Sequence, residues 1–273
     1  MIVRNLYGAE IPGSVLSMMN STVGSGMLGL PFAFSKSGWV LGTILMVLSA
    51  ICTVFGLDLL TACALMVPQP PHLFDVADLA LPHVAGIVDV AVAILSFGGT
   101  TAYLMIIGDL MPLVIEEFGG QQWWQQRTVW VCVGFAVVAP LCCVRTLKAL
   151  EYTAALSVAF TLFITLVVAL FSCQIDGLDP CADTDDCVGA RTNVSTTYAT
   201  LRTLPIFIFA FACHTNIFPI AAELRGMSQG KMGWVICLSM GCIFVIYMIL
   251  AVSGYQTYGD KVDPNILISY PRK

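Results

Sequence analysis

Charged residues are scarce in this sequence of 273 residues: 11% are Asp, Glu, Lys or Arg, and 58% are apolar. Soluble domains carry about 25% charged residues, so the composition excludes a soluble core and indicates a polytopic membrane protein in a lipid bilayer. The formal net charge is −5 at pH 7. This mild acidic surplus argues against nucleic acid as a partner.

Motifs for metal binding, redox chemistry and proteolysis are absent as well. The eleven cysteines form no CxxC pair and the three histidines no HExxH motif, so no metal site and no cofactor are predicted. An intramembrane enzyme is also disfavoured, and no catalytic residue is assigned. The histidine within an apolar segment, His214, has only Cys213 beside it, and adjacent helical residues point about 100° apart.

Seven apolar segments can cross a bilayer, which takes roughly 20 helical residues. The expected transmembrane helices are residues 13–35, 39–66, 86–113, 128–147, 152–174, 201–222 and 232–255. The predicted fold class is therefore an all-α polytopic membrane protein, with a Pro-rich surface connection at residues 67–84. Asp58 lies within the second segment; carboxylates there mark functional sites or helix ends, and both interpretations stay open.

The first apolar segment is interrupted at its middle by Val23-Gly24-Ser25-Gly26. Glycine frees the backbone from helical geometry, and a break at this depth is tolerated only where it is buried in protein or lines a cavity. Such a break indicates the binding site of a transporter. A packing face of small residues between helices is the alternative. A dinucleotide-binding loop is excluded, because no strand precedes the glycines.

The sixth segment carries a second, polar interruption. Pro205 and Pro219 bracket an aromatic run that ends in Cys213-His214-Thr215-Asn216. Because His and Asn are costly inside a span, His214 and Asn216 are candidates for a polar gate; alternatively, His214 bridges helices in the interior. The two interrupted segments lie five spans apart, the spacing expected of an inverted repeat whose first helices are both broken.

The loop at residues 175–200 is predicted to lie outside the cytoplasm. It holds the glycosylation motif at Asn193 and the pair Cys181 and Cys187, with five residues between them. An oxidising compartment permits a disulfide there, although Cys173 is a rival partner. The positive-inside rule adds no support, since this orientation puts five Lys and Arg residues inside and seven outside.

Longer motifs carry a resemblance to a known family. They are Val23-Gly24-Ser25-Gly26-Met27-Leu28-Gly29-Leu30-Pro31 in the first segment, Phe209-Ala210-Phe211-Ala212-Cys213-His214 in the sixth, and Gly254-Tyr255-Gln256-Thr257-Tyr258-Gly259 at the end of the seventh. These residues resemble the amino acid/auxin permease family, most closely its sodium-coupled neutral amino acid transporters. The resemblance covers nearly the whole chain and implies a LeuT-type inverted-repeat fold of about eleven helices. With seven expected here, we anticipate either the N-terminal part of a longer protein or a natural short form.

The resemblance also implies a substrate site at the first interruption. The carboxylate of an amino acid would be held by the backbone N–H groups of Gly24, Ser25 and Gly26, because free amides at the N-terminus of a half-helix suit an anion. Tyr103 would act as a lid or as a neighbour of that carboxylate.

On the other side of the substrate, the resemblance implies carbonyl groups of the sixth segment. The amino group would meet those around Phe209, Ala210 and Phe211. Asn20 matches an asparagine implicated in cation binding in the sodium-coupled branch. A hydrogen bond between helices is the alternative role for Asn20.

The predicted function is secondary active transport of amino acids, most simply small neutral ones, coupled to Na⁺ or H⁺ by alternating access. The alternative is a membrane sensor or fragment on the same fold that does not transport. The plasma membrane and the vacuolar or lysosomal membrane both agree with an outward-facing glycosylation motif. The amino acid, the coupling ion and the oligomeric state stay open.

Overall fold

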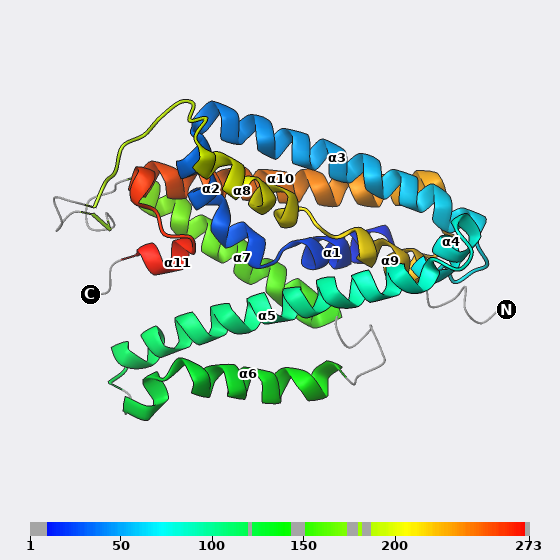
Figure 1. The fold of residues 1–273 in the computed structure, drawn as a ribbon, viewed down its shortest axis with the longest axis horizontal. Coiled ribbons are helices and arrows are strands. Elements are labelled where there is room, and N and C mark those ends of the chain that lie inside the picture. Colours follow the sequence, from blue (N-terminus) through cyan, green and yellow to red (C-terminus); the bar gives the residue numbers. More distant parts are fainter. Residues whose placement is uncertain (1–9, 120–121, 143–150, 174–179, 182–186, 271–273) are drawn as a thin grey trace.

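The computed structural model describes residues 10–119, 122–142, 151–173, 180–181 and 187–270. All regular elements in these ranges are helices (Figure 1). In chain order they are α1 (Ile11–Thr22), η2 (Ser25–Gly29), α2 (Leu30–Ser37), α3 (Trp39–Met66), α4 (Leu73–Ala80), α5 (Ala85–Glu117), η3 (Gln122–Gln125), α6 (Arg127–Cys142), α7 (Glu151–Ser172), α8 (Tyr198–Ala210), η5 (His214–Asn216), α9 (Ile217–Glu223), α10 (Gln229–Tyr258), η6 (Gly259–Lys261) and α11 (Ile266–Ser269), where η marks a 3-10 helix.

Five helical segments in the described chain are long and apolar enough to cross a membrane, which confirms a multi-pass integral membrane protein. They are Trp39–Met66, Ala85–Glu117, Ala154–Ser172, Tyr198–Glu223 and Gln229–Lys261. The first expected span is divided into α1 and α2, and the fourth is represented by the shorter α6. The count of seven spans and the inverted repeat therefore remain predictions.

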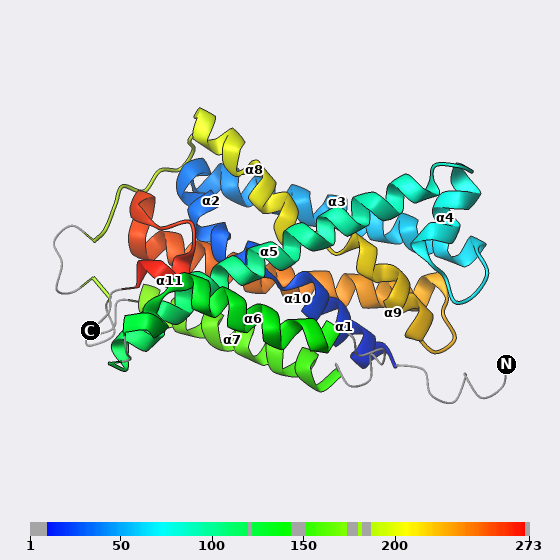
Figure 2. The same cartoon turned by 60° about the horizontal axis from the view of Figure 1, so that its bottom comes forward.

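Helix α10 lies at the centre of the bundle and packs against α1, α2, α3 and α7 (Figures 1 and 2). Its inward stripe includes Met232, Ile243 and Leu250, none of which is exposed. Two tyrosines on the same helix, Tyr247 and Tyr255, are equally buried. A buried tyrosine hydroxyl needs a hydrogen-bond partner, so both mark places where polar backbone approaches α10.

Helices α5 and α6 form a pair beside the bundle, below it in Figure 1. Along α5, apolar side chains stay open: Ile87 and Ile94 are 67% exposed and Phe97 is 76% exposed. Hydrocarbon is the solvent for a membrane-spanning helix, so such a surface fits a bilayer. The inner side of α5 reaches the bundle near η2.

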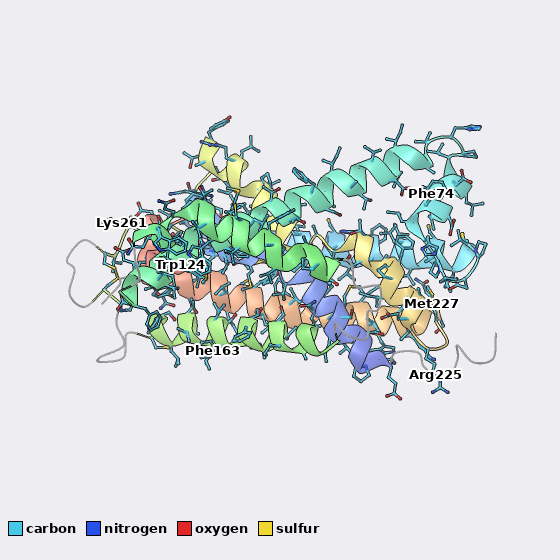
Figure 3. All side chains as sticks on the ribbon, turned by 90° about the horizontal axis from the view of Figure 1, so that it is seen from below. Phe74, Trp124, Phe163, Arg225, Met227 and Lys261 are labelled. Atoms are coloured by element: carbon cyan, nitrogen blue, oxygen red, sulfur yellow. A yellow bond between two sulfur atoms is a disulfide. The ribbon has the colours of Figure 1, made fainter. Side chains whose placement is uncertain are left out.

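Charged side chains mark the two ends of the molecule. Figure 3 places Lys261 and Arg225 at opposite ends of the long axis, whereas Phe163 points outward from the middle of α7 and is 61% exposed. This distribution indicates that the long axis runs across the membrane.

The residues after the disulfide loop lie across one end of the bundle. Backbone bonds attach them to the turn between α2 and α3: Trp39 N–H donates to Thr192 O at 3.2 Å, and Val40 N–H donates to Asn193 O at 2.9 Å. The hydroxyl of Tyr255 accepts from Thr192 N–H at 2.8 Å. The segment is therefore anchored both to this turn and to α10.

The structure refines one expectation about the connections, and other expected bounds lie partly outside the described residues. The Pro-rich segment at residues 67–84 contains a helix, α4, that begins at Leu73 once the prolines have ended at Pro71. Helix α6 ends at Cys142 in the described chain, and residues 143–147 of the expected fourth span lie outside the described residues. Residues 174–179 and 182–186 of the expected outer loop lie outside them as well.

Candidate functional site

The first interruption is a true break in the helix. Helix α1 closes with Val23 N–H donating to Met19 O at 2.8 Å; Val23 and Gly24 are then extended, and η2 follows. Helix α2 restarts with Pro31 in its first turn, a position where the missing N–H of proline costs nothing. The amides at the start of η2 have no earlier helical carbonyl to bind.

The second interruption follows α8. Phe211 N–H and Ala212 N–H donate back to Ile208 O and Phe209 O and so close the helix. Residues up to Cys213 are then non-helical before η5 and α9 begin. Both breaks predicted from the sequence are thus present in the backbone.

The two breaks touch each other. A Cβ built on Gly26 would lie 3.0 Å from Ala210 Cα and 3.1 Å from Phe209 Cδ1. A Cβ built on Gly24 would lie 2.5 Å from the hydroxyl oxygen of Tyr103 on α5. The structure therefore brings Gly24, Gly26, Tyr103, Phe209 and Ala210 together, with the backbone of Ser25 between the two glycines.

The remaining candidates lie around this junction rather than in it. The ring of Phe211 is fully buried and meets Tyr247 edge-on, with centroids 5.3 Å apart. The imidazole of His214 lies against α3, since a Cβ on Gly56 would be 3.0 Å from His214 Nε2. Asn216 ends η5 and is half-buried. This contact agrees with a bridging role for His214, and the polar gate at His214 and Asn216 stays a prediction.

Asn20 lies on α1, less than one turn before its end, and is half-buried. Its side chain makes no hydrogen bond to the described residues. The alternative role of an interhelical hydrogen bond thus finds no partner in that part of the chain. Its role in cation binding stays a prediction.

Sequence reasoning missed Tyr247 at this junction. Its hydroxyl oxygen lies 3.0 Å from Thr22 O and 3.1 Å from Ala210 O, the last carbonyls of α1 and α8. The signal in the sequence is faint: one tyrosine in the apolar run Phe244–Leu250. Its partners are 225 and 37 residues away.

Clusters of three or more His, Cys, Asp or Glu that could hold a metal are absent from the described residues. A groove of about 660 Å³ does exist, between α3 and α10 on the outside of the bundle. It is apolar except for Asp58 at one end, whose Oδ1 accepts from Gln229 Nε2 at 2.7 Å. This bond to a helix end agrees with the structural interpretation of Asp58, and no residue of either break lines the groove.

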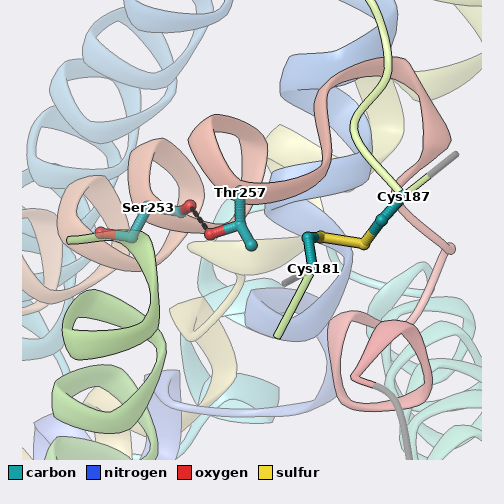
Figure 4. Close-up of a disulfide and its surroundings, with 4 residues drawn as sticks. All are labelled: Cys181, Cys187, Ser253 and Thr257. Carbon is teal, nitrogen blue, oxygen red and sulfur yellow. Dashed lines mark hydrogen bonds between the residues drawn. A yellow bond between two sulfur atoms is a disulfide. The ribbon is translucent and has the colours of Figure 1, made fainter. Parts of the chain in front are cut away.

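In the predicted outer loop, Cys181 and Cys187 form a disulfide (Figure 4). Nearby on α10, the Thr257 hydroxyl donates to Ser253 O at 2.9 Å. Cys173, the rival partner, is a free and exposed thiol. The side chain of Asn193 is exposed, so a glycan would meet no buried surface there.

Residues 8–273 match a family model described as "Transmembrane amino acid transporter protein". The chain belongs to this family. The resemblance found in the sequence is thereby confirmed, and the family is one of transporters rather than enzymes.

Curated relatives agree along almost the whole chain. Vacuolar amino acid transporter 5 of Schizosaccharomyces pombe is 29% identical over 94% of this chain and 60% of its own length. Vacuolar amino acid transporter 7 of Saccharomyces cerevisiae is 30% identical over 94% of this chain and 51% of its own length. Sodium-coupled neutral amino acid transporter 7 of Bos taurus is 27% identical over 95% of this chain and 57% of its own length.

The chain therefore spans between half and three fifths of the length of these relatives. No solved structure matches it.

Proposed function

We propose that the junction of the two breaks binds an amino acid and that the protein carries it across the membrane by alternating access. The observation that carries this proposal is the contact of the two broken helices at Gly26 and Ala210. On one side of this contact are amides at the start of η2, and on the other side are carbonyls at the end of α8. The two ends of an α-amino acid need these two kinds of group.

The carboxylate is assigned to the backbone N–H groups of Gly24, Ser25 and Gly26. The N-terminus of a half-helix carries unpaired donors and the positive end of its dipole, both of which favour an anion. The absence of side chains at the two glycines lets the substrate backbone approach closely. The hydroxyl of Tyr103 lies over Gly24, where it can cover a bound carboxylate.

The amino group is assigned to the carbonyls that follow Phe209, at the negative end of α8. Phe209 is 41% exposed, and its ring lies over Gly26. A ring in that position restricts the space beside Gly26, in keeping with a small neutral substrate. Movement of the broken helices against the rest of the LeuT-type fold would then open the site to each side in turn.

The test is uptake by the purified chain in proteoliposomes, with radiolabelled alanine, glutamine and glutamate as probes. An inward Na⁺ gradient and an inward H⁺ gradient are applied separately, so the coupling ion is read from the gradient that drives accumulation. Uptake of a neutral amino acid above that of empty vesicles supports the proposal. Binding of the probe without accumulation under either gradient would identify a sensor in place of a transporter.

The native membrane is proposed to be vacuolar or lysosomal, as the names of several relatives suggest for those proteins. The oxidised pair at Cys181 and the exposed Asn193 fit a loop that faces the lumen. Fluorescence of a tagged chain, together with a mobility shift on deglycosylation, checks both points.

A further inference from the structure

Tyr247 lies where the C-terminal ends of two broken helices converge. Its hydroxyl is 3.0 Å from Thr22 O, the last carbonyl of α1, and 3.1 Å from Ala210 O, the last carbonyl of α8. The side chain is fully buried, and its ring is held by the edge contact with Phe211. A single side chain of α10 thus touches both interruptions.

We propose that Tyr247 is a positioning residue that holds the two breaks together and so sets the geometry of the substrate site. This inference rests on the proposed function in one respect, namely that the junction of the breaks is where the substrate binds. Tyr247 itself lies behind the junction, on the central helix, and is not assigned a contact with substrate.

The hydroxyl is the decisive part of the side chain. The last carbonyls of a helix have no intrahelical partner, and a buried acceptor without a donor is costly. The phenol has one proton, so it donates to one carbonyl at a time while remaining within hydrogen-bonding distance of the other. The bond can therefore pass from α1 to α8 without either helix leaving α10.

Loss of this hydroxyl would leave both carbonyls without their donor. Phenylalanine keeps the ring and its packing on Phe211, so Tyr247→Phe removes one oxygen and little else. Thr22 O and Ala210 O would then separate or admit water. Because Gly26 touches Ala210, the distance between the amide side and the carbonyl side of the site would change with them.

The chain contains a matched control in Tyr255. It lies on the same helix, two turns further on, and is also fully buried. Its hydroxyl bonds to the backbone of Thr192, accepting from the N–H at 2.8 Å, at the outer end of the bundle. Tyr255→Phe therefore removes the same atom from the same helix, away from the breaks.

The first measurement needs no substrate. Cys213 is a free thiol, 1% exposed, three residues after Ala210 in the second break. Wild-type chain and both variants are reconstituted and treated with N-ethylmaleimide, and labelling is quantified for each cysteine by peptide mass spectrometry. We expect Tyr247→Phe to raise the labelling rate of Cys213 about tenfold, the factor for one lost buried hydrogen bond. Tyr255→Phe should leave it at the wild-type value, with Cys237 and Cys242, both exposed, as internal references.

The second measurement is amino acid uptake per mole of reconstituted protein. A positioning role predicts that Tyr247→Phe raises the apparent KM about tenfold, whereas a purely structural role would lower the amount of folded protein at an unchanged KM. Wild-type labelling of Cys213 in Tyr247→Phe overturns the inference. Faster labelling of Cys213 in a chain whose wild type shows no uptake would leave standing that Tyr247 holds the two breaks together, and would remove the proposed function and with it the role at a substrate site.

If Tyr247→Phe yields no folded protein, Phe211→Leu takes its place. It keeps the hydroxyl and loosens the ring that orients it. The same rise in Cys213 labelling is then expected, and an unchanged rate overturns the inference.

Discussion

The two helix breaks are built in opposite ways. The first, after α1, consists of an extended Val23-Gly24 pair followed by Gly26, with other parts of the chain lying against the bare glycine backbone. The second, after α8, keeps its side chains: Phe211 is fully buried and Cys213 is 1% exposed. The first break depends on the absence of side chains, which lets neighbouring groups approach its backbone, and the second is fixed because its side chains fill the core.

This difference assigns different roles to the two halves of the junction. A backbone without side chains presents N–H groups that a ligand can reach. A break whose side chains are buried presents carbonyls in a fixed place, and here a hydroxyl from α10 holds one of them. Substitutions that add side-chain atoms should therefore impair uptake at the first break. Substitutions that remove side-chain atoms should impair it at the second.

The largest effect is expected from Gly26→Val. The Cβ of valine would lie 3.0 Å from Ala210 Cα, and its two methyl groups would fill the space assigned to the substrate backbone. Uptake should fall about a hundredfold or more, because the backbone of Ala210 cannot move away as a flexible side chain could. Proteoliposome uptake per mole of folded protein measures this.

Gly230→Val is the matched control, since nothing lies within 4 Å of a Cβ at Gly230 on α10. It should retain wild-type uptake. Wild-type uptake in Gly26→Val would remove the first break from the substrate site.

A smaller loss of uptake, about tenfold, is expected from Gly24→Ala. The new Cβ would meet an atom of a side chain, and a side chain can move aside. That atom is the Tyr103 hydroxyl oxygen, 2.5 Å away. Tyr103→Phe removes it, so the double variant should take up more substrate than Gly24→Ala alone. The four proteins form a double-mutant cycle. Additive losses would mean that the two residues do not meet during transport.

Much of this junction could be predicted from the sequence, because its chemistry is local. The glycines at 24 and 26 lie in the first break itself. The prolines at 205 and 219 lie inside α8 and α9, on either side of the second break, so they bracket that break without marking its position. The helix α4 was missed for a related reason: three prolines before it indicated a loop, whereas the residues after Pro71 are free to form a helix.

Tyr247 could not be predicted in the same way. Its hydroxyl bonds join residues 225 and 37 positions apart, so nothing in the adjacent sequence distinguishes it from a tyrosine that faces lipid or the membrane interface. The same holds for the surroundings of His214, whose ring lies against Gly56 of α3, far away in the sequence. Tertiary packing, rather than residue type, decides what both side chains contact.

Removal of a side chain should test the second break. Phe209→Ala takes away a ring that covers Gly26, and we expect the apparent KM for a small neutral amino acid to rise about fivefold through lost apolar contact. Ile208→Ala is the control, since Ile208 is adjacent and 57% exposed. Equal effects of the two substitutions would show that the ring does not cover the site.

The smallest effect is expected from Asn20→Ala, on α1 just before the first break. Loss of one amide oxygen near a bound cation should raise the half-saturating concentration of that ion about threefold, the scale of one weak polar contact. Because the substrate amides follow the helix and Asn20 precedes its end, KM at saturating ion should stay unchanged. Ser17→Ala, one turn earlier on α1, serves as the control. The measurement is uptake at a fixed substrate concentration while the ion concentration is varied. An unaltered dependence on Na⁺ and on pH would place the coupling ion away from Asn20. A rise in the substrate KM alone would place Asn20 in the substrate site.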